Sequence, residues 1–119
     1  YKIVGNYLLK NPNEQKILEK LAKSKSLWER RLSIVSTWAL IRQNQLDWTM
    51  KNAKTLLPDT EDLTHKAVGW MLREVCKRDN KIVEDFLKNN YANVPRTTLR
   101  YAIERMEEKK RKSFLKGDL

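Results

Sequence analysis

Hydrophobic residues recur every three to four positions along most of the chain, and no segment shows the strict apolar–polar alternation of a half-buried strand. Residues that favour helix starts interrupt this pattern at regular intervals: Asn11 before Pro12, Ser26, Asp47, Asp59 or Thr60, Asn80, and Pro95 with Thr97. The pattern predicts six short helices, at about 11–23, 27–43, 47–57, 60–78, 80–88 and from 95 into the charged run 107–112.

Short loops join the predicted helices, so consecutive helices are expected to lie antiparallel. The helices form three pairs of similar length, 11–43, 47–78 and 80–112, each about 30–35 residues long, as in helical solenoid repeats. Sequence identity between the pairs is weak, which leaves a bundle as the other arrangement. The spacing favours an all-α solenoid of antiparallel helix pairs.

The chain starts with Tyr1 rather than Met, and residues 1–10 look like the later part of a helix. We therefore expect residues 1–119 to form a single helical-repeat domain that is the C-terminal portion of a larger one. No apolar run is long enough for a membrane span, and no secretory signal is present, so we expect a cytoplasmic protein. Cys76 and His65 are single and cannot complete a four-ligand metal site. We expect the protein to need neither a metal nor a cofactor, and we expect it to be a monomer.

The second predicted helix carries an arginine on its apolar side. At 100° per residue, Arg31 lies in the middle of an arc formed by Leu27, Trp28, Leu32, Ile34, Val35, Trp38, Ala39 and Ile41. Arg42 shares this side, but it lies near the helix end and can reach water. A guanidinium against an apolar wall needs an anionic partner. That partner is either a carboxylate within the protein or a phosphate in a cleft.

The helix at 60–78 shows the complementary pattern. Its buried arc consists of Leu63, Ala67, Val68, Met71, Leu72 and Val75. Lys66, Trp70, Arg73 and Lys77 project together on another side, as a ridge of three cations with one indole. Trp70 borders the apolar arc, so packing at the edge of the core is its alternative role. The mid-helix Gly69 indicates close approach of another backbone or a ligand, because glycine costs about 1 kcal/mol in a helix.

Arg96 and Arg100 add cations near the start of the last helix, where free N–H groups favour an anion. The second helices of all three pairs thus carry cations, and in stacked pairs these helices line one concave surface. The chain as a whole has 25 basic and 15 acidic residues, a net charge of +10. This excess favours a polyanionic partner, with an acidic membrane surface or simple solubility as the alternatives. The mixed-sign run 107–112 is interpreted as a solvated face.

Three segments on these helices resemble signatures of the HEAT-like DNA alkylation-repair glycosylases: WERR at 28–31, GWMLRE at 69–74 and PRTTLRYA at 95–102. The resemblance covers nearly the whole chain in order, and the second segment, preceded by Lys66 and Ala67, is the most specific. It implies a HEAT-like fold and hydrolysis of the N-glycosidic bond of cationic N3- or N7-alkylated purines in duplex DNA.

The same resemblance assigns roles to individual residues. Arg31 and Trp70 fall on the catalytic positions, and Arg73 falls on a basic position of its motif. With Lys66, Lys77, Arg96 and Arg100, Arg73 is expected to contact the DNA. The family's aspartate belongs to a segment before Tyr1, so the resemblance implies that this chain alone does not catalyse base release. An alkylated purine is already a cationic leaving group, so the reaction needs a carboxylate to stabilise the oxocarbenium-like sugar rather than a strong acid.

Two other functions remain open at this stage. A non-catalytic DNA-binding scaffold would share the basic surface and lack the upstream aspartate. A helical-repeat adaptor for proteins would present a neutral hydrophobic groove instead of a cationic ridge with an indole.

Overall fold

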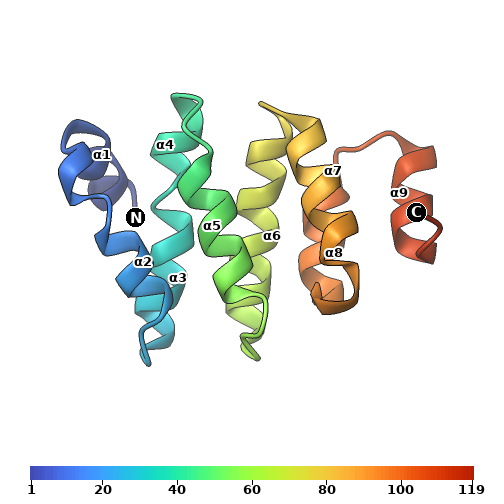
Figure 1. Ribbon diagram of the computed structural model, residues 1–119, viewed down its shortest axis with the longest axis horizontal. Helices are drawn as coiled ribbons and strands as arrows, with labels where there is room; N and C mark the ends of the chain where they lie inside the picture. The colour runs from blue at the N-terminus through green and yellow to red at the C-terminus, as the bar shows by residue number, and fades with distance from the viewer.

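The computed structural model describes residues 1–119 as nine α-helices and two single-turn 3₁₀ helices, with no strand. The α-helices are α1 (Lys2–Lys10), α2 (Ile17–Ala22), α3 (Leu27–Val35), α4 (Trp38–Arg42), α5 (Asp47–Leu56), α6 (Asp62–Cys76), α7 (Asn80–Asn89), α8 (Arg96–Ile103) and α9 (Glu108–Lys116). The 3₁₀ helices are η1 (Pro12–Glu14) and η2 (Tyr91–Asn93). Figure 1 shows the helices side by side, with the two termini at opposite ends of an array measuring 41 × 29 × 19 Å.

The helices stack in two rows. Helix α2 packs on α3, α5 on α6, and α7 on α6, while α2 and α5 also contact each other. The second helices of the three pairs form the other row, in which α6 lies between α3 and α8. This arrangement confirms the predicted all-α, solenoid-like fold. Helix α6, the longest, contacts both neighbours in its row and therefore holds the array together.

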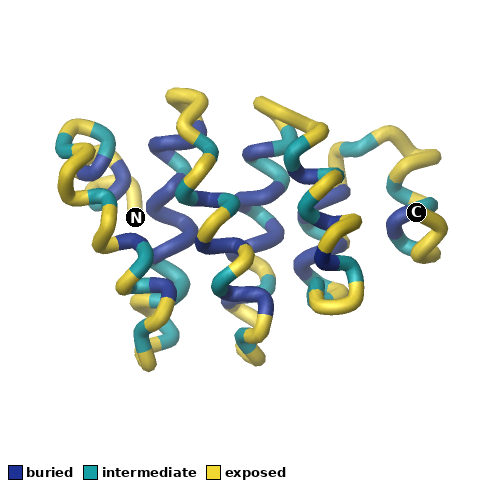
Figure 2. Tube along the Cα trace, in the orientation of Figure 1, coloured by how far each residue is buried: buried dark blue, intermediate teal, exposed yellow.

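The main core runs along this array. Seventeen buried residues form one cluster, and Figure 2 shows their dark blue segments along the middle of the helices, with exposed turns at the helix ends. Leu8, Leu18 and Leu40 form a second, smaller cluster beneath α1. Inside the main core, the Asn52 amide donates to the carbonyl oxygens of Leu18 and Ser33, both at 3.0 Å. This side chain therefore links α5 to α2 and α3.

The predicted helix at 27–43 is wrong in one respect, because it breaks between α3 and α4. The Thr37 hydroxyl donates to the Ile34 carbonyl oxygen at 2.5 Å, and the Thr37 N–H bonds to the same oxygen, three residues back. Helix α1 packs against this break, where a Cβ on Gly5 would lie only 2.6 Å from the Ser36 carbonyl oxygen. The predicted helix at 11–23 divides similarly into η1 and α2.

The C-terminal end also differs from the prediction. Helix α8 ends at Ile103, and the charged run begins a separate helix, α9, that sequence periodicity missed. Phe114 anchors α9 in the core with 2% of its surface exposed. Two bonds tie its end to earlier segments: the Tyr91 hydroxyl donates to the Phe114 carbonyl oxygen, and Arg96 donates to that of Leu115 at 2.7 Å. The run is thus the solvated face of a helix whose other face is anchored.

Helix starts follow the sequence signals to within a residue or two. The Ser26 hydroxyl accepts a bond from the Glu29 N–H, as predicted. Asp79 rather than Asn80 caps α7, accepting from the Ile82 N–H. Asp47 lies inside α5 as its first residue and makes no capping bond. These shifts leave the helical faces unchanged.

Two residues assigned to buried arcs are exposed instead. Trp28 has 66% of its surface exposed and Leu63 has 40%. Both lie in the first turn of a helix. Helix α1 packs along α4 and not along the start of α3, so nothing covers Trp28. The apolar arc of each helix is therefore shorter than its sequence pattern indicates.

Gly69 lies where α6 and α8 approach most closely. A Cβ at this position would lie 2.5 Å from the Tyr101 Cβ and 2.9 Å from the Thr98 carbonyl oxygen. Of the two possibilities raised by the sequence, close approach of another backbone is confirmed. The Thr98 hydroxyl strengthens the same junction by donating to the His65 carbonyl oxygen at 2.8 Å.

Replacing Gly69 with alanine should therefore destabilise the fold, although alanine is the better helix former. Overpacking costs about 1–3 kcal/mol and helix propensity returns up to about 1 kcal/mol, so we expect a net loss of about 1–2 kcal/mol. Urea unfolding of Gly69→Ala beside Lys20→Ala, an exposed helical position, measures the difference. A Gly69→Ala protein as stable as Lys20→Ala would contradict the close approach of α8.

Candidate functional site

Three neighbouring helices contribute to one pocket of about 270 Å³. Its lining residues are Arg31 from α3, Lys66, Ala67, Trp70 and Arg73 from α6, and Tyr101 from α8. Four of these six residues were predicted as site residues. They come together because α6 lies between α3 and α8, so side chains one or two turns apart on α6 meet residues from both neighbours.

Arg31 is the unusual member of this pocket. Its side chain is partly buried, its Nε atom is fully buried, and that atom has no hydrogen-bond partner. No carboxylate lies within ion-pair distance of it. The internal salt bridge, one of the two alternatives for Arg31, is therefore absent. A guanidinium in this position is unfavourable for folding alone and is ready to bind an anion.

The preceding residue, Arg30, shows the opposite behaviour. Its Nε donates to the Asp59 carboxylate at 2.7 Å, and its Nη1 donates to the carbonyl oxygens of Ser24 and Lys25 at 3.1 and 2.9 Å. Burial opposes ionisation of Asp59, but hydrogen bonds from the Glu61 N–H and from Arg30 outweigh it, so the pKa of Asp59 lies below its ordinary value. This pair fixes the start of α3 against the loop before α6. With Arg30 held there, Arg31 is directed into the pocket.

The two cations on α6 have carboxylate partners at the protein surface. Lys66 pairs with Asp62 at 3.1 Å, and Arg73 pairs with Glu104, the residue that follows α8. The hydrogen bond and charge of Asp62 raise the pKa of Lys66, with a smaller contribution from Tyr101. Asp62 and Glu104 have side chains that are 63% and 59% exposed, so these ion pairs are screened by solvent and weak.

Trp70 combines both roles considered for it. It packs partly buried against the main core and also lines the pocket. The Tyr1 ring contacts it edge-on, with 5.7 Å between ring centroids, and contacts Trp38 in the same way at 6.4 Å. The Arg42 guanidinium lies 4.9 Å from the Trp38 ring and is exposed, as expected from its place at the helix end.

Three predicted DNA contacts lie outside this pocket. Lys77 is just past the end of α6, pairs with Glu74 at 2.9 Å and lines a separate pocket with Cys76 and Arg105. The predicted ridge is therefore one residue shorter than the helical projection indicates. Arg96 is engaged with α9 through the Leu115 carbonyl oxygen. Arg100 is exposed on α8 and has no partner in the protein.

Tyr101 is a pocket residue that the sequence analysis did not select. It is part of the PRTTLRYA segment, directly after Arg100, but its helical face could not be related to α6 from the sequence. The signal that could have found it is Gly69, since the residue packed against a mid-helix glycine lies on the neighbouring helix at the same level.

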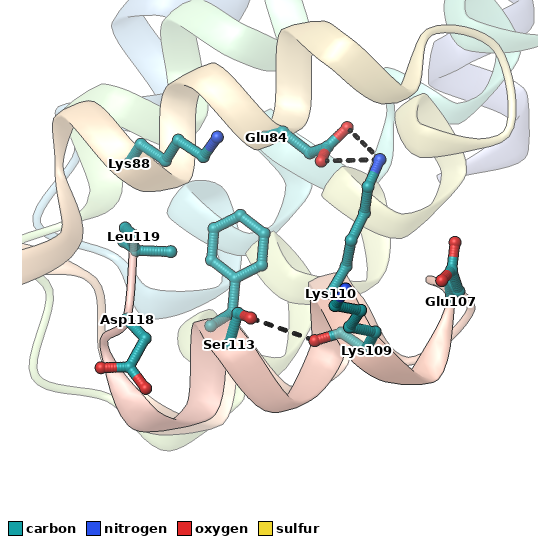
Figure 3. Close-up of a pocket in the computed structure, with 9 residues that line it drawn as sticks. Glu84, Lys88, Glu107, Lys109, Lys110, Ser113, Asp118 and Leu119 are labelled. Atoms are coloured by element: carbon teal, nitrogen blue, oxygen red, sulfur yellow. Dashed lines mark hydrogen bonds and ion pairs between the residues drawn. The ribbon is translucent and has the colours of Figure 1, made fainter.

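A second pocket, of about 360 Å³, lies between α7 and α9 at the C-terminal end (Figure 3). Figure 3 shows Lys110 of α9 reaching the Glu84 carboxylate of α7, at 3.1 Å. Lys88 and Lys109 line the same pocket and are exposed to solvent. Lys110 is thus paired with a carboxylate within the protein, in contrast to Arg31.

Other reactive groups lie apart from the Arg31 pocket. Burial raises the pKa of the Cys76 thiol to about 11, with the Glu84 charge as the next cause, and the thiol donates to Asn80. The His65 ring bonds to the Asp59 carbonyl oxygen at 2.5 Å. No group of three or more His, Cys, Asp or Glu side chains is placed to hold a metal ion. None of the helices has the length and apolar character needed to cross a membrane.

Arg30 and Arg31 should respond in opposite directions to replacement by methionine. Arg31→Met removes an unpaired, partly buried charge, so we expect a gain of about 1 kcal/mol in the free energy of unfolding. Arg30→Met leaves the Asp59 carboxylate without its partner and should lose about 2–4 kcal/mol. Urea unfolding of the two variants beside the wild type measures both. A similar loss for Arg31→Met would mean that Arg31 is a structural residue.

The family of the chain that carries this pocket follows from comparison with known proteins. No curated protein and no solved structure is significantly similar to it. The family model described as "DNA alkylation repair enzyme" matches residues 1–106, which include every helix that contributes to the Arg31 pocket. The match ends just before α9 and covers well over half of the chain. The chain therefore belongs to the family of DNA alkylation repair enzymes.

Proposed function

We propose that this protein takes part in alkylation repair as a DNA glycosylase, hydrolysing the N-glycosidic bond of cationic N3- or N7-alkylated purines in duplex DNA. The observation that carries the proposal is the unpaired guanidinium of Arg31 inside a pocket that also contains Trp70. A planar guanidinium binds a phosphate through two parallel hydrogen bonds, which fixes both the position and the orientation of the strand.

The surrounding cations support a DNA backbone as the ligand. Lys66 and Arg73 border the same pocket, and Arg100 is exposed on the neighbouring helix. Because the pairs with Asp62 and Glu104 are exposed, each is weak and can be exchanged for a phosphate contact. The surface thus offers several cations to successive phosphates, and among them Arg31 alone has a buried nitrogen without a partner.

Trp70 suits the charged base. An indole face attracts a cation such as an N-alkylated purine, and this attraction strengthens when the site is desolvated. The lining residues include no carboxylate, so the group that would stabilise the oxocarbenium-like sugar is not among them. In this proposal Arg31 and Trp70 bind and orient the lesion, and a carboxylate outside the pocket lining completes the chemistry.

DNA binding should depend strongly on salt. Neutralising about five phosphates predicts a slope of roughly −4 to −5 in log K against log salt concentration. Lys66→Ala and Arg73→Ala should each flatten this slope by about one unit and weaken binding to all sequences alike. Fluorescence anisotropy with a short labelled duplex over a range of salt concentrations measures the slopes.

Lys77→Ala is the matched control for these variants. Lys77 is close to Arg73 in sequence, but it pairs with Glu74 and lines another pocket. For Lys77→Ala, the slope of log K against log salt concentration should remain near that of the wild type. If Lys77→Ala flattens the slope as much as Arg73→Ala, the DNA does not follow the Arg31 pocket.

Base release tests the chemistry directly. We expect residues 1–119, whose pocket lining holds no carboxylate, to bind methylated duplex yet release base little faster than the spontaneous reaction. A protein that adds the family's aspartate to this pocket should excise 3-methyladenine or 7-methylguanine and leave neutral lesions. In that protein, Arg31→Ala should slow excision by about one to two orders of magnitude, as expected for the loss of one charged positioning contact. Single-turnover assays on methylated duplex measure these rates.

Two outcomes would change the proposal. Rapid excision by the 119-residue chain would show that its own carboxylates suffice and would direct attention to Glu29 and Glu74. Failure of the aspartate-containing protein on every cationic lesion, combined with salt-dependent DNA binding, would identify a non-catalytic DNA-binding scaffold.

A further inference from the structure

Tyr101 occupies a distinctive place in the Arg31 pocket. It comes from α8, whereas Arg31 comes from α3, and the two residues lie on opposite sides of the α6 residues that complete the lining. Its ring makes no aromatic contact with Trp70, whose only aromatic partner is Tyr1. Both residues line the pocket, so a ligand there can contact each of them.

The Tyr101 hydroxyl group makes no hydrogen bond within the protein. The contrast is Tyr91, a half-buried tyrosine whose hydroxyl donates to the Phe114 carbonyl oxygen. A phenol that reaches a ligand pocket without a partner has a donor available for that ligand. Lys66 lines the same pocket, and Tyr101 contributes to the raised pKa of this lysine.

The packing that brings Tyr101 to the pocket is specific. The Tyr101 Cβ lies 2.5 Å from the position that a Cβ on residue 69 would occupy. Tyr101 therefore packs against α6 at Gly69, the one residue of that helix without a side chain. Glu104, three residues later and just past the end of α8, pairs with Arg73. The end of α8 thus places Tyr101 and Glu104 together along the basic edge of α6.

Resting on the proposed function, we propose that Tyr101 is a further substrate-positioning residue. Its hydroxyl donates a hydrogen bond to a phosphate oxygen of the lesion-bearing strand, beside Lys66 and across Trp70 from Arg31. The strand would then be held on both sides of the indole, by a charged donor from α3 and a neutral donor from α8. A phosphate is the fitting acceptor because the flanking groups are cations.

The test compares Tyr101→Phe with the wild type in the same duplex-binding assay, using a short duplex that carries one 7-methylguanine. Loss of a hydrogen bond to a charged acceptor should lower the affinity about tenfold or more. The salt slope should stay unchanged, because a phenol releases no counterion, whereas Lys66→Ala should flatten it by about one unit. A merely structural residue would not produce this split between affinity and slope.

Tyr91→Phe serves as the matched control. It removes a hydroxyl that joins η2 to α9, so it should lower the melting temperature while leaving the affinity for DNA intact. Thermal unfolding of Tyr101→Phe should give a melting temperature close to that of the wild type, since its hydroxyl has no partner in the protein. A loss of affinity that only follows a loss of stability would overturn the inference.

The outcomes also separate this inference from the proposed function. If the wild type shows the predicted salt slope but Tyr101→Phe binds as tightly, Tyr101 has no positioning role and the proposed function stands. If the wild type does not bind duplex DNA at all, both fail together. If Tyr101→Phe flattens the slope as Lys66→Ala does, the hydroxyl acts only through the lysine, and the proposed phosphate contact is wrong.

Discussion

The contact between α6 and α8 at Gly69 determines how the rest of the molecule is arranged. Without a Cβ on Gly69, the Thr98 backbone and the Tyr101 Cβ can lie against α6, and α8 joins the row that α3 begins on the other side. The pocket exists because this row is continuous. A glycine that weakens helix α6 locally therefore contributes to the fold through packing between helices, and it also sets the depth at which Tyr101 enters the pocket.

Two adjacent arginines of α3 differ in whether the protein itself satisfies their charge. Arg30 satisfies its guanidinium with Asp59 and two carbonyl oxygens, which attaches α3 to the next repeat. Arg31, about 100° further around the helix, has a buried Nε without any partner. An unfavourable group persists in a fold when the surrounding structure supplies enough stability elsewhere. The Arg30–Asp59 pair and the helix packing around α6 are the sources of that stability here.

Local signals were sufficient for most helices and for the position of Arg31, because both depend on side-chain spacing along one helix. They failed where distant segments decide the outcome. The break between α3 and α4 is associated with α1 packing at Gly5, and α9 is held by bonds to Tyr91 and Arg96. The helical projection placed Lys77 beside Arg73, yet the end of α6 and the Glu74 pair direct it elsewhere. Tyr101 was missed for the same reason, since its relation to α6 is a tertiary property.

The cations of the pocket differ in how they are paired within the protein, and this difference bears on the proposed DNA binding. Lys66 and Arg73 are held by exposed carboxylates, so their positions are defined while their charges remain exchangeable. Arg31 is partly shielded from water and unpaired, so a phosphate that reaches it gains a stronger interaction than one at the rim. Binding at the rim alone is then weak and independent of sequence. In the proposed function, only a strand that enters the pocket would reach Arg31, and that strand would lie beside Trp70.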